Sequence, residues 1–341
     1  MRAENMNCSF CKDRSIYNNE TKYKTVKYCK NHFIKNFEKK VDNTIKKNSL
    51  IKNNEKIVCA TSGGKDSLTV LYLSKKYIEE NKLNSSIEAI VIDEGIPGYR
   101  DKTIEDVKKF CKKYEIKLKI ASFKKAYGKE LEEILAKRKK NLSKLNKNNE
   151  KNYKENSENY NKKQGSPCTT CGILRRDLLN KSCVEKYDKM ITGHNMDDEV
   201  QTALMNIFFG KTDLIARMGP VTGISEVQGF VQRVKPLHMC AEKEVTIYAF
   251  LKGFRNEFTE CPNAKLSFRA FIRDEINSLG NSREIKQNIN RSILEILPKL
   301  KKTSKEKSTS KQILKKCISC SSPSALEQCK SCTIAEEIRA L

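Results

Sequence analysis

The sequence has no long hydrophobic run: nothing in its 341 residues approaches the ~20 consecutive apolar residues of a membrane-spanning helix. Its first residues, MRAENMNCSF, also lack the apolar segment of a secretory signal. These absences predict a cytoplasmic protein without a membrane partner. Because disulfides are rare in the cytoplasm, the 14 cysteines favour metal or redox chemistry over structural disulfides.

Acidic residues are scarce relative to basic ones. The chain has 42 Asp and Glu against 67 Lys and Arg, which gives a formal net charge of +25. Such an excess says little about the fold, but it favours a polyanionic partner bound through phosphate contacts. A composition rich in Lys and Asn, inherited from an AT-rich genome, is the alternative explanation, and we expect both to contribute.

No internal repeat is present apart from cysteine-rich stretches at the two ends, so the pattern in the middle of the chain defines the fold class. Apolar runs typical of strands alternate there with helical patterns such as residues 67–79 and 102–114. This alternation predicts an α/β domain whose parallel sheet is covered by helices on both faces. The expected strands are residues 56–61, 87–93, 117–123, 189–192 and 229–234.

Composition divides the chain into three parts. We expect an N-terminal metal-binding module with a docking helix (1–45), the α/β domain (46–300), and a linker followed by a second metal-binding module (301–341). Residues 301–316 are basic and polar, as linkers often are. Residues 141–164 are mostly Asn, Lys and Glu without an apolar period, which predicts a flexible surface insertion.

A loop with two glycines, SGGKDS, follows the first expected strand. Glycines let the backbone turn tightly, and the helix that follows presents free N–H groups and a positive dipole end to an anion. The loop is not of the GxxxxGK[ST] type, so the usual β/γ-phosphate cradle is not expected. The residues predicted to bind the nucleotide are Ser62, Gly63, Gly64, Lys65, Asp66 and Ser67.

This loop resembles the PP-loop of the N-type ATP pyrophosphatases, which split ATP between its α and β phosphates to adenylate a substrate. Further motifs narrow the resemblance to the TtcA/TtuA branch, whose members make 2-thiouridine or 2-thiocytidine in tRNA. These motifs are IDEGIPGYR (92–100), CTTCGILRR (168–176), TGHNMDD (192–198) and ECP (260–262). Metal-binding ends are typical of the TtuA and cytosolic tRNA 2-thiolation subgroup, and the resemblance also implies a homodimer.

Several of these motifs close expected strands, so they converge on one ligand beyond the carboxyl edge of the sheet. Carboxylates with phosphates suit Mg²⁺, and the candidates are Asp93, Glu94, Asp197 and Asp198, although helix capping explains Asp197 equally well. His194 is either a proton carrier or a structural turn donor. We predict that Asp66 and Asp198 are the catalytic carboxylates.

The resemblance also assigns residues around the nucleotide. It implies that Arg175 reaches the ATP phosphates, and that Ala60, Ile92 and Gly193 offer backbone contacts to the adenosine. On a helix expected after residue 265, Arg269 and Arg273 stand four residues apart. They are explained equally well by a tRNA-binding face and by an ordinary solvated face.

The cysteines near the two ends form sets of four ligands. Cys8-x-x-Cys11 with Cys29-x-x-His32 has the spacing of a tetrahedral Zn²⁺ site. A second set, all cysteine, predicts a second structural Zn²⁺. Its members are Cys317, Cys320, Cys329 and Cys332.

Seven cysteines lie outside these sets. Cys59, Cys111 and Cys183 fall on apolar strand or helix patterns and are expected in the core, and Cys240 is left unassigned. The others, Cys168, Cys171 and Cys261, form a set one ligand short of four. Spacing alone leaves open a [4Fe–4S] cluster, a three-thiolate Zn²⁺ or a catalytic dithiol carrying a persulfide. The resemblance favours the cluster.

These observations lead to a functional hypothesis. The chain is predicted to be an ATP-dependent tRNA 2-thiouridine synthetase that adenylates the C2 oxygen of a uridine, which sulfur then replaces as AMP leaves. The wobble uridine is the expected target, and the T-loop uridine is the alternative. The sulfur donor is a ubiquitin-like thiocarboxylate protein, a persulfide or sulfide. A zinc-ribbon RNA-binding protein with an inactive PP-loop is the rival hypothesis from another class.

Overall fold

The computed structural model describes residues 7–20, 24–147, 167–224, 227–254, 261–262, 268–311 and 315–339. Its centre is a five-stranded parallel sheet, which confirms the predicted fold class. The strands are β3 (Lys56–Ala60), β4 (Ser86–Asp93), β5 (Leu118–Ser122), β6 (Lys189–Thr192) and β7 (Gln232–Val234). All five predicted strands are present, and the last is shorter than expected.

The order of the strands in the sheet determines where a ligand can bind. The order is β5-β4-β3-β6-β7, so the chain moves outward in one direction from β3 and then in the other from β6. In open α/β sheets the loops beyond the carboxyl ends of two such neighbouring strands diverge and leave a crevice. SGGKDS follows β3 and GHNMDD follows β6, so both loops lie at this point.

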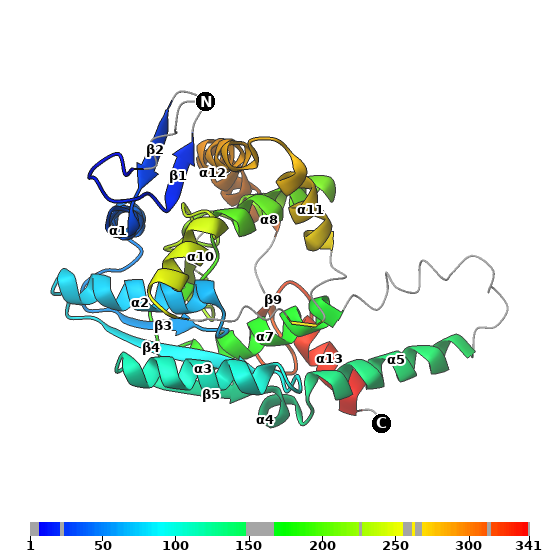
Figure 1. Cartoon of the computed structure of the whole chain (residues 1–341). Helices are drawn as coiled ribbons and strands as arrows, with labels where there is room; N and C mark the ends of the chain where they lie inside the picture. Colours follow the sequence, from blue (N-terminus) through cyan, green and yellow to red (C-terminus); the bar gives the residue numbers. More distant parts are fainter. Residues whose placement is uncertain are drawn as a thin grey trace.

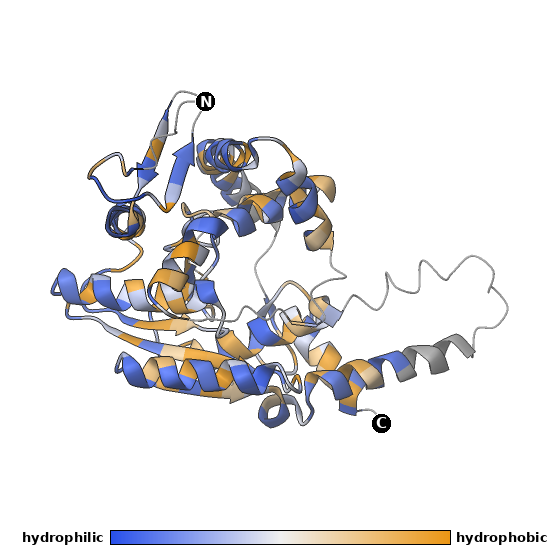
Figure 2. Ribbon diagram, viewed as in Figure 1, coloured by the Kyte–Doolittle hydropathy of each residue, from blue (hydrophilic) through white to orange (hydrophobic). Residues whose placement is uncertain are grey.

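Helices cover both faces of the sheet. One face packs against α1 (Lys30–Lys47), α2 (Lys65–Glu80), α3 (Arg100–Lys113) and α10 (Glu242–Leu251). The other packs against α4 (Phe123–Tyr127), α5 (Leu131–Lys147), α7 (Pro167–Cys183) and α13 (Lys330–Arg339). Since both faces are buried, the central strands are continuously apolar, and Figure 2 shows them in orange between helices with blue outer turns.

Four helices form a separate group beside the sheet, at the upper right of Figure 1. They are α8 (Met196–Phe208), α9 (Thr212–Ile215), α11 (Phe268–Ser278) and α12 (Ser282–Lys311). Ala203 on α8 packs with Ile293 and Leu297 on α12 in one cluster, and Met196 packs with Ile272 and Ile276 of α11 in another. The group therefore has an apolar core of its own.

The two cysteine-rich modules lie far apart on the molecule (Figure 1). The first consists of the hairpin β1 (Tyr17–Glu20) and β2 (Thr25–Tyr28) followed by α1. The expected docking stripe of α1, Phe33, Phe37, Val41 and Ile45, is fully buried against the core. The second contains β8 (Lys315–Lys316), β9 (Pro323–Ser324) and α13, whose Ile334 and Ile338 pack beside α7.

Two segments differ from the sequence expectation. Residues 141–147 belong to helix α5 rather than to a flexible insertion, while 148–164 lie outside the described residues. Residues 301–311 continue helix α12 rather than forming a linker. Residues 141–147 contain leucine and lysine, and residues 301–311 are rich in lysine; these are good helix formers, so each helix continues into the polar sequence. The domain boundaries themselves stay predictions.

Cysteines expected in the core are buried. Cys59, Cys111 and Cys183 are each at most 3% exposed, and Cys240, left unassigned from the sequence, is fully buried as well. Burial raises the pKa of Cys111 and of Cys183 to about 11, so these thiols stay protonated at neutral pH. Within the described part of the chain, no helix combines the length and apolar character that crossing a membrane requires.

Candidate functional site

The PP-loop forms a compact turn between β3 and α2. The Ser67 hydroxyl donates to the Gly64 carbonyl (2.9 Å), and the Ser62 N–H donates to Ser67 Oγ (3.1 Å). Gly63 has φ +82°, and a Cβ there would lie 2.7 Å from the Thr103 carbonyl oxygen, so only glycine fits. Gly64 caps α2 without a side-chain bond, which leaves the N-terminal N–H groups of the helix available to an anion.

The loop after β6 packs directly on this turn. A Cβ on Gly193 would lie 2.9 Å from the backbone of Asp66 and Ser67, so glycine permits the close approach. Asn195 Nδ2 donates to Asp66 Oδ1 (3.0 Å), and the other oxygen of Asp66 pairs with Lys65 at 2.9 Å. Burial raises the pKa of Asp66 despite Lys65. The loop thus holds this carboxylate in one position.

A pocket opens at the carboxyl edge of the sheet beside the PP-loop. Its wall includes Ala60, Ser62, Ile92 and Arg175, all predicted from the sequence to contact the nucleotide. Leu179, one turn after Arg175 on α7, contributes to the same wall. Gly63, Gly64, Lys65, Asp66 and Gly193 are not part of this wall, but they form the adjoining turn described above.

Glu94 is the anionic centre of this pocket. It is fully buried and pairs with Arg100 on α3 (2.5 Å) and with Arg175 on α7 (3.3 Å). Glu94 was a magnesium candidate from the sequence, but here it serves two guanidinium groups. Arg100 was missed, because no local pattern reveals that it crosses to Glu94 and donates to the Ser62 carbonyl (3.1 Å).

The acidic residues on α8 have different roles. Asp197 is buried; its carboxylate accepts from the Glu242 N–H at the start of α10 (2.8 Å) and pairs with Lys286 of α12 (2.6 Å). These contacts support the capping alternative, although the helix capped is α10. Asp198 forms a capping box with Asn195, and partial burial raises its pKa even though Arg269 opposes this.

Two residues whose role the sequence left open, His194 and Arg269, have structural contacts. His194 Nδ1 lies 2.9 Å from Thr192 Oγ1, and burial followed by Lys235 lowers the pKa of His194 to about 4. A neutral imidazole at physiological pH supports the turn role over the proton carrier. Arg269 donates to Thr202 Oγ1 (2.8 Å) and pairs with Asp198 (3.6 Å), so it joins α11 to α8. Its side chain is not a free RNA-binding cation.

Cys168, Cys171 and Cys261 come together in space from distant parts of the sequence. Cys168 and Cys171 lie on the first turn of α7, and Cys171 and Cys261 pack on the same apolar cluster. Burial raises the pKa of Cys168 and of Cys171, the latter to about 11, and the proximity of Cys261 raises both further. No described cysteine forms a disulfide.

These three residues fit the donor set of an iron–sulfur cluster. The raised pKa values of Cys168 and Cys171 mean that their protons must be displaced for ligation, as metals do when they bind cysteine. Arg175 opposes the rise in pKa at Cys168 and at Cys171, and Arg100 also opposes it at Cys171. These cations are therefore placed to stabilise the thiolate forms. Among the described residues the site offers three cysteine ligands, which fits a cluster with one iron not ligated by the protein.

The two terminal cysteine sets have tetrahedral spacing. Two thiolates on one zinc lie about 3.8 Å apart, because each Zn–S bond is about 2.3 Å long. Cys11 and Cys29 Sγ are 3.6 Å apart, and Cys320 and Cys329 Sγ are 3.7 Å apart. In each set all four ligand atoms lie within 4.8 Å of one another. Both sets can therefore hold a metal ion in a closed site.

Comparison with known proteins identifies the family. The fold and the SGGKDS loop define a PP-loop nucleotide-binding protein, and residues 33–152 match the PP-loop domain family. The chain is 35% identical over 331 residues to a protein of Methanocaldococcus jannaschii named "Probable sulfurtransferase", covering 97% of this chain and 87% of that one. The protein belongs to the family of PP-loop tRNA 2-thiolation enzymes.

Two further relatives support this family assignment. The tRNA-5-methyluridine(54) 2-sulfurtransferase of Pyrococcus horikoshii is 31% identical over 96% of this chain and 93% of its own length. A solved structure, the U34-tRNA thiolase NcsA from Methanococcus maripaludis with its [4Fe–4S] cluster, matches with a TM-score of 0.72. That match has 31% identity and covers 98% of this chain and 97% of the other.

Proposed function

We propose that this protein is an ATP-dependent tRNA-uridine 2-sulfurtransferase. The observation that carries the proposal is the position of α7. This one helix carries Cys168 and Cys171 near its start and Arg175 in the wall of the nucleotide pocket. A nucleotide bound over the PP-loop and sulfur held at the cysteines then meet at one edge of the sheet.

The chain's own groups suit adenylation of a uridine oxygen. The N–H groups at the start of α2 and the charge of Arg175 stabilise negative charge on the phosphates as it develops. Asp66 and Asp198 are the carboxylates that would hold Mg²⁺ against the phosphates. Adenylation joins AMP to the C2 oxygen and releases pyrophosphate; sulfur then forms a bond to C2, and AMP departs with the oxygen.

Cys168, Cys171 and Cys261 would hold a [4Fe–4S] cluster whose chemistry is to bind and deliver the sulfur atom. Around it, α7 fixes the first two thiols relative to each other, and Arg175 and Arg100 offset their negative charge. The donor supplying sulfur is a sulfide, a persulfide or a ubiquitin-like thiocarboxylate. The terminal sets, Cys8/Cys11/Cys29/His32 and Cys317/Cys320/Cys329/Cys332, would each hold a structural Zn²⁺.

The wobble uridine is the proposed target, supported by the NcsA likeness over nearly the whole of both chains. The T-loop uridine is the second candidate, favoured by the relative that is named for position 54. A cytoplasmic location agrees with both, because cysteine ligands have to stay reduced. A homodimer is implied by the family resemblance and stays a proposal.

The test is a single-turnover reaction under anaerobic conditions. Full-length protein is incubated with an unmodified tRNA transcript, ATP, Mg²⁺ and sulfide, and nucleosides are mapped by mass spectrometry. We expect 2-thiouridine at position 34 and one AMP for each sulfur inserted. Asp66→Ala should abolish both products, while Asp101→Ala, an exposed carboxylate on α3, should leave them unchanged. If the unaltered protein releases no AMP and leaves the tRNA unmodified, the result would favour the rival hypothesis of an inactive PP-loop.

A further inference from the structure

Among the described residues, two arginines near the pocket have no carboxylate partner. Through their side chains, Arg176 of α7 and Arg233 of β7 form neither a hydrogen bond nor an ion pair within the described part of the chain. Five other described arginines form an ion pair with a carboxylate outside their own helix. These are Arg100 and Arg175 with Glu94, Arg138 with Glu337, Arg269 with Asp198, and Arg283 with Glu244.

Contacts of the Asn180 side chain bring together the segments of α7 and β7 that carry the two arginines. Asn180 Nδ2 donates to the Gly229 carbonyl (2.8 Å), and the Val231 N–H donates to Asn180 Oδ1 (3.1 Å), which ties α7 to the approach to β7. Arg176 is one turn before Asn180 on the same helix face, and Arg233 is two residues after Val231 on the same strand face. Both therefore extend from this contact toward the carboxyl edge of the sheet.

The charged groups that lower the pKa values of the two arginines are other arginines. Burial and then Arg175 lower the pKa of Arg176, and burial and then Arg176 lower the pKa of Arg233. The groups that oppose these effects are the thiols of Cys171 and Cys183, not carboxylates. Two neighbouring guanidinium groups that no described carboxylate neutralises repel each other, and an anion between them removes that repulsion.

The geometry points to a phosphate-binding site between Arg176 and Arg233 that takes a phosphodiester of the RNA backbone next to the reacting nucleotide. This inference rests on the proposed function, since it places part of the tRNA. Planar guanidinium groups bind phosphate oxygens in pairs. Neither arginine lines the nucleotide pocket, whereas their neighbour Arg175 does, so the anion lies beside the ATP and not within its site.

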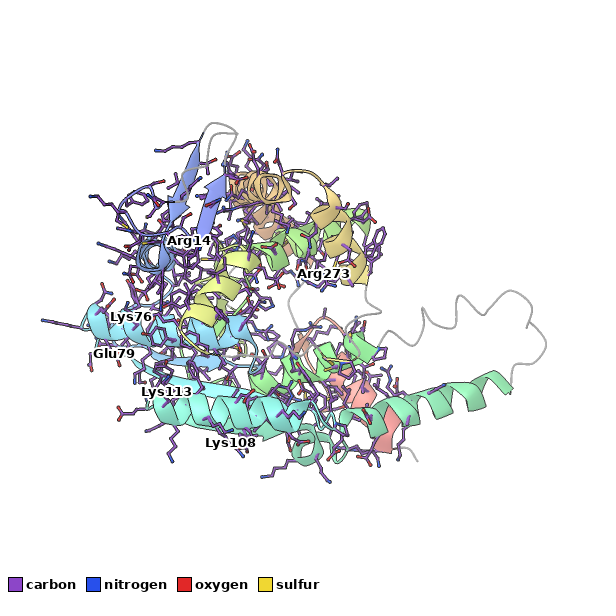
Figure 3. All side chains as sticks on the ribbon, in the orientation of Figure 1. Arg14, Lys76, Glu79, Lys108, Lys113 and Arg273 are labelled. Atoms are coloured by element: carbon purple, nitrogen blue, oxygen red, sulfur yellow. The ribbon has the colours of Figure 1, made fainter. Side chains whose placement is uncertain are left out.

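Binding measurements with substitutions at both positions test the site. The full-length protein, prepared anaerobically, is titrated with an unmodified tRNA transcript between low and moderate KCl. Arg176→Gln and Arg233→Gln are compared with Lys108→Gln, which removes the same charge from the outer face of α3, on the opposite side of the sheet (Figure 3). ATP affinity and the thermal midpoint are measured on every variant.

We expect each arginine variant to weaken tRNA binding about tenfold and to lower the slope of log K against log salt by about 1. ATP affinity should stay within twofold, and Lys108→Gln should behave like the unaltered protein. An equal loss of tRNA affinity in Lys108→Gln overturns the site. So does an unchanged tRNA affinity in a variant that carries both Arg176→Gln and Arg233→Gln. A loss of ATP affinity alone would assign the anion to the nucleotide and also overturns it.

The outcome is separable from that of the proposed function. If the unaltered chain binds tRNA through these arginines but inserts no sulfur, the proposed activity fails and the phosphate site stands. If it thiolates tRNA while both arginine variants bind and react normally, the proposed activity stands and the phosphate site fails.

Discussion

At the scale of single residues, Glu94 is the side chain on which the pocket depends most. It is fully buried, and it is the carboxylate that pairs with both Arg100 and Arg175. A buried ion pair adds little net stability relative to an apolar pair, but removing one partner leaves an uncompensated charge. Glu94 therefore keeps Arg175 directed toward the pocket, and the buried Arg100 requires Glu94 as its counter-ion.

Glu94→Gln tests this dependence. We expect the free energy of unfolding to fall by about 3–5 kcal/mol, because the buried Arg100 loses its counter-ion. Urea denaturation measures the change. Glu105→Gln, which breaks the exposed pair with Lys108, should cost less than about 1 kcal/mol. Equal effects at the two positions would contradict the assigned role of Glu94.

His238 predicts how stability changes with pH. It is 2% exposed and lies 3.6 Å from Glu199, and burial lowers its pKa from 6.5 to about 4, with Lys235 acting in the same direction. Between these pH values the unfolded chain binds a proton that the folded chain does not. Stability is therefore complete above pH 6.5 and falls as the pH drops toward 4, by up to about 3 kcal/mol.

Comparing the unaltered protein with His238→Gln isolates this contribution. Denaturant midpoints measured from pH 7 to pH 4 should fall less steeply for the variant. Parallel curves for the two proteins would show that other groups account for the acid sensitivity.

At the scale of elements, the start of α8 combines a structural and a functional role. Asn195 forms the capping box with Asp198 and also donates to Asp66 in the PP-loop. The same side chain therefore starts one helix and orients a carboxylate at the start of another. This coupling explains why the loop after β6 has to approach so closely, which only Gly193 permits.

Asn195→Ala should affect both stability and chemistry. Loss of the cap is expected to cost about 1 kcal/mol, and loss of the bond to Asp66 should reduce the rate of AMP formation at least tenfold. Ser122→Ala is the matched control, because Ser122 caps α4 through the Lys125 N–H (3.2 Å). It should cost similar stability without lowering the rate. Similar rates in both variants would exclude the positioning role.

The sequence predicts some elements well for a physical reason. Buried parallel strands have to be apolar throughout, so β3, β4 and β6 are visible as short runs, and loops at their ends carry the motifs. The extent of α12 and the pairing of Arg269 are not visible, because lysine-rich sequence suits both helix and linker, and a basic residue on a helix shows no sign of its partner on α8. The ion pair between Glu94 and Arg100 is likewise not visible in the sequence.

At the scale of the whole molecule, the cysteine ligands form three separate sets that differ in ligand number. The proposed content is two zinc ions and four irons per chain, and on that basis Cys11→Ser should remove one zinc ion and leave the iron content unchanged. Cys171→Ser should lower iron and leave zinc at two. Elemental analysis of anaerobically purified protein measures both. Loss of iron in Cys11→Ser would mean that the sites are not independent.

The packing of α13 has a consequence for how the protein is made. Ile334 and Ile338 complete the cluster that holds Leu174, Cys171 and Cys261, and Glu337 pairs with Arg138 of α5 (2.8 Å). Residues 330–339 leave the ribosome long after α7. During translation the nucleotide-binding half can fold first, but one side of the cysteine site stays uncovered until residues 330–339 have been made. A chain interrupted before residue 330 should therefore bind ATP and fail to retain iron.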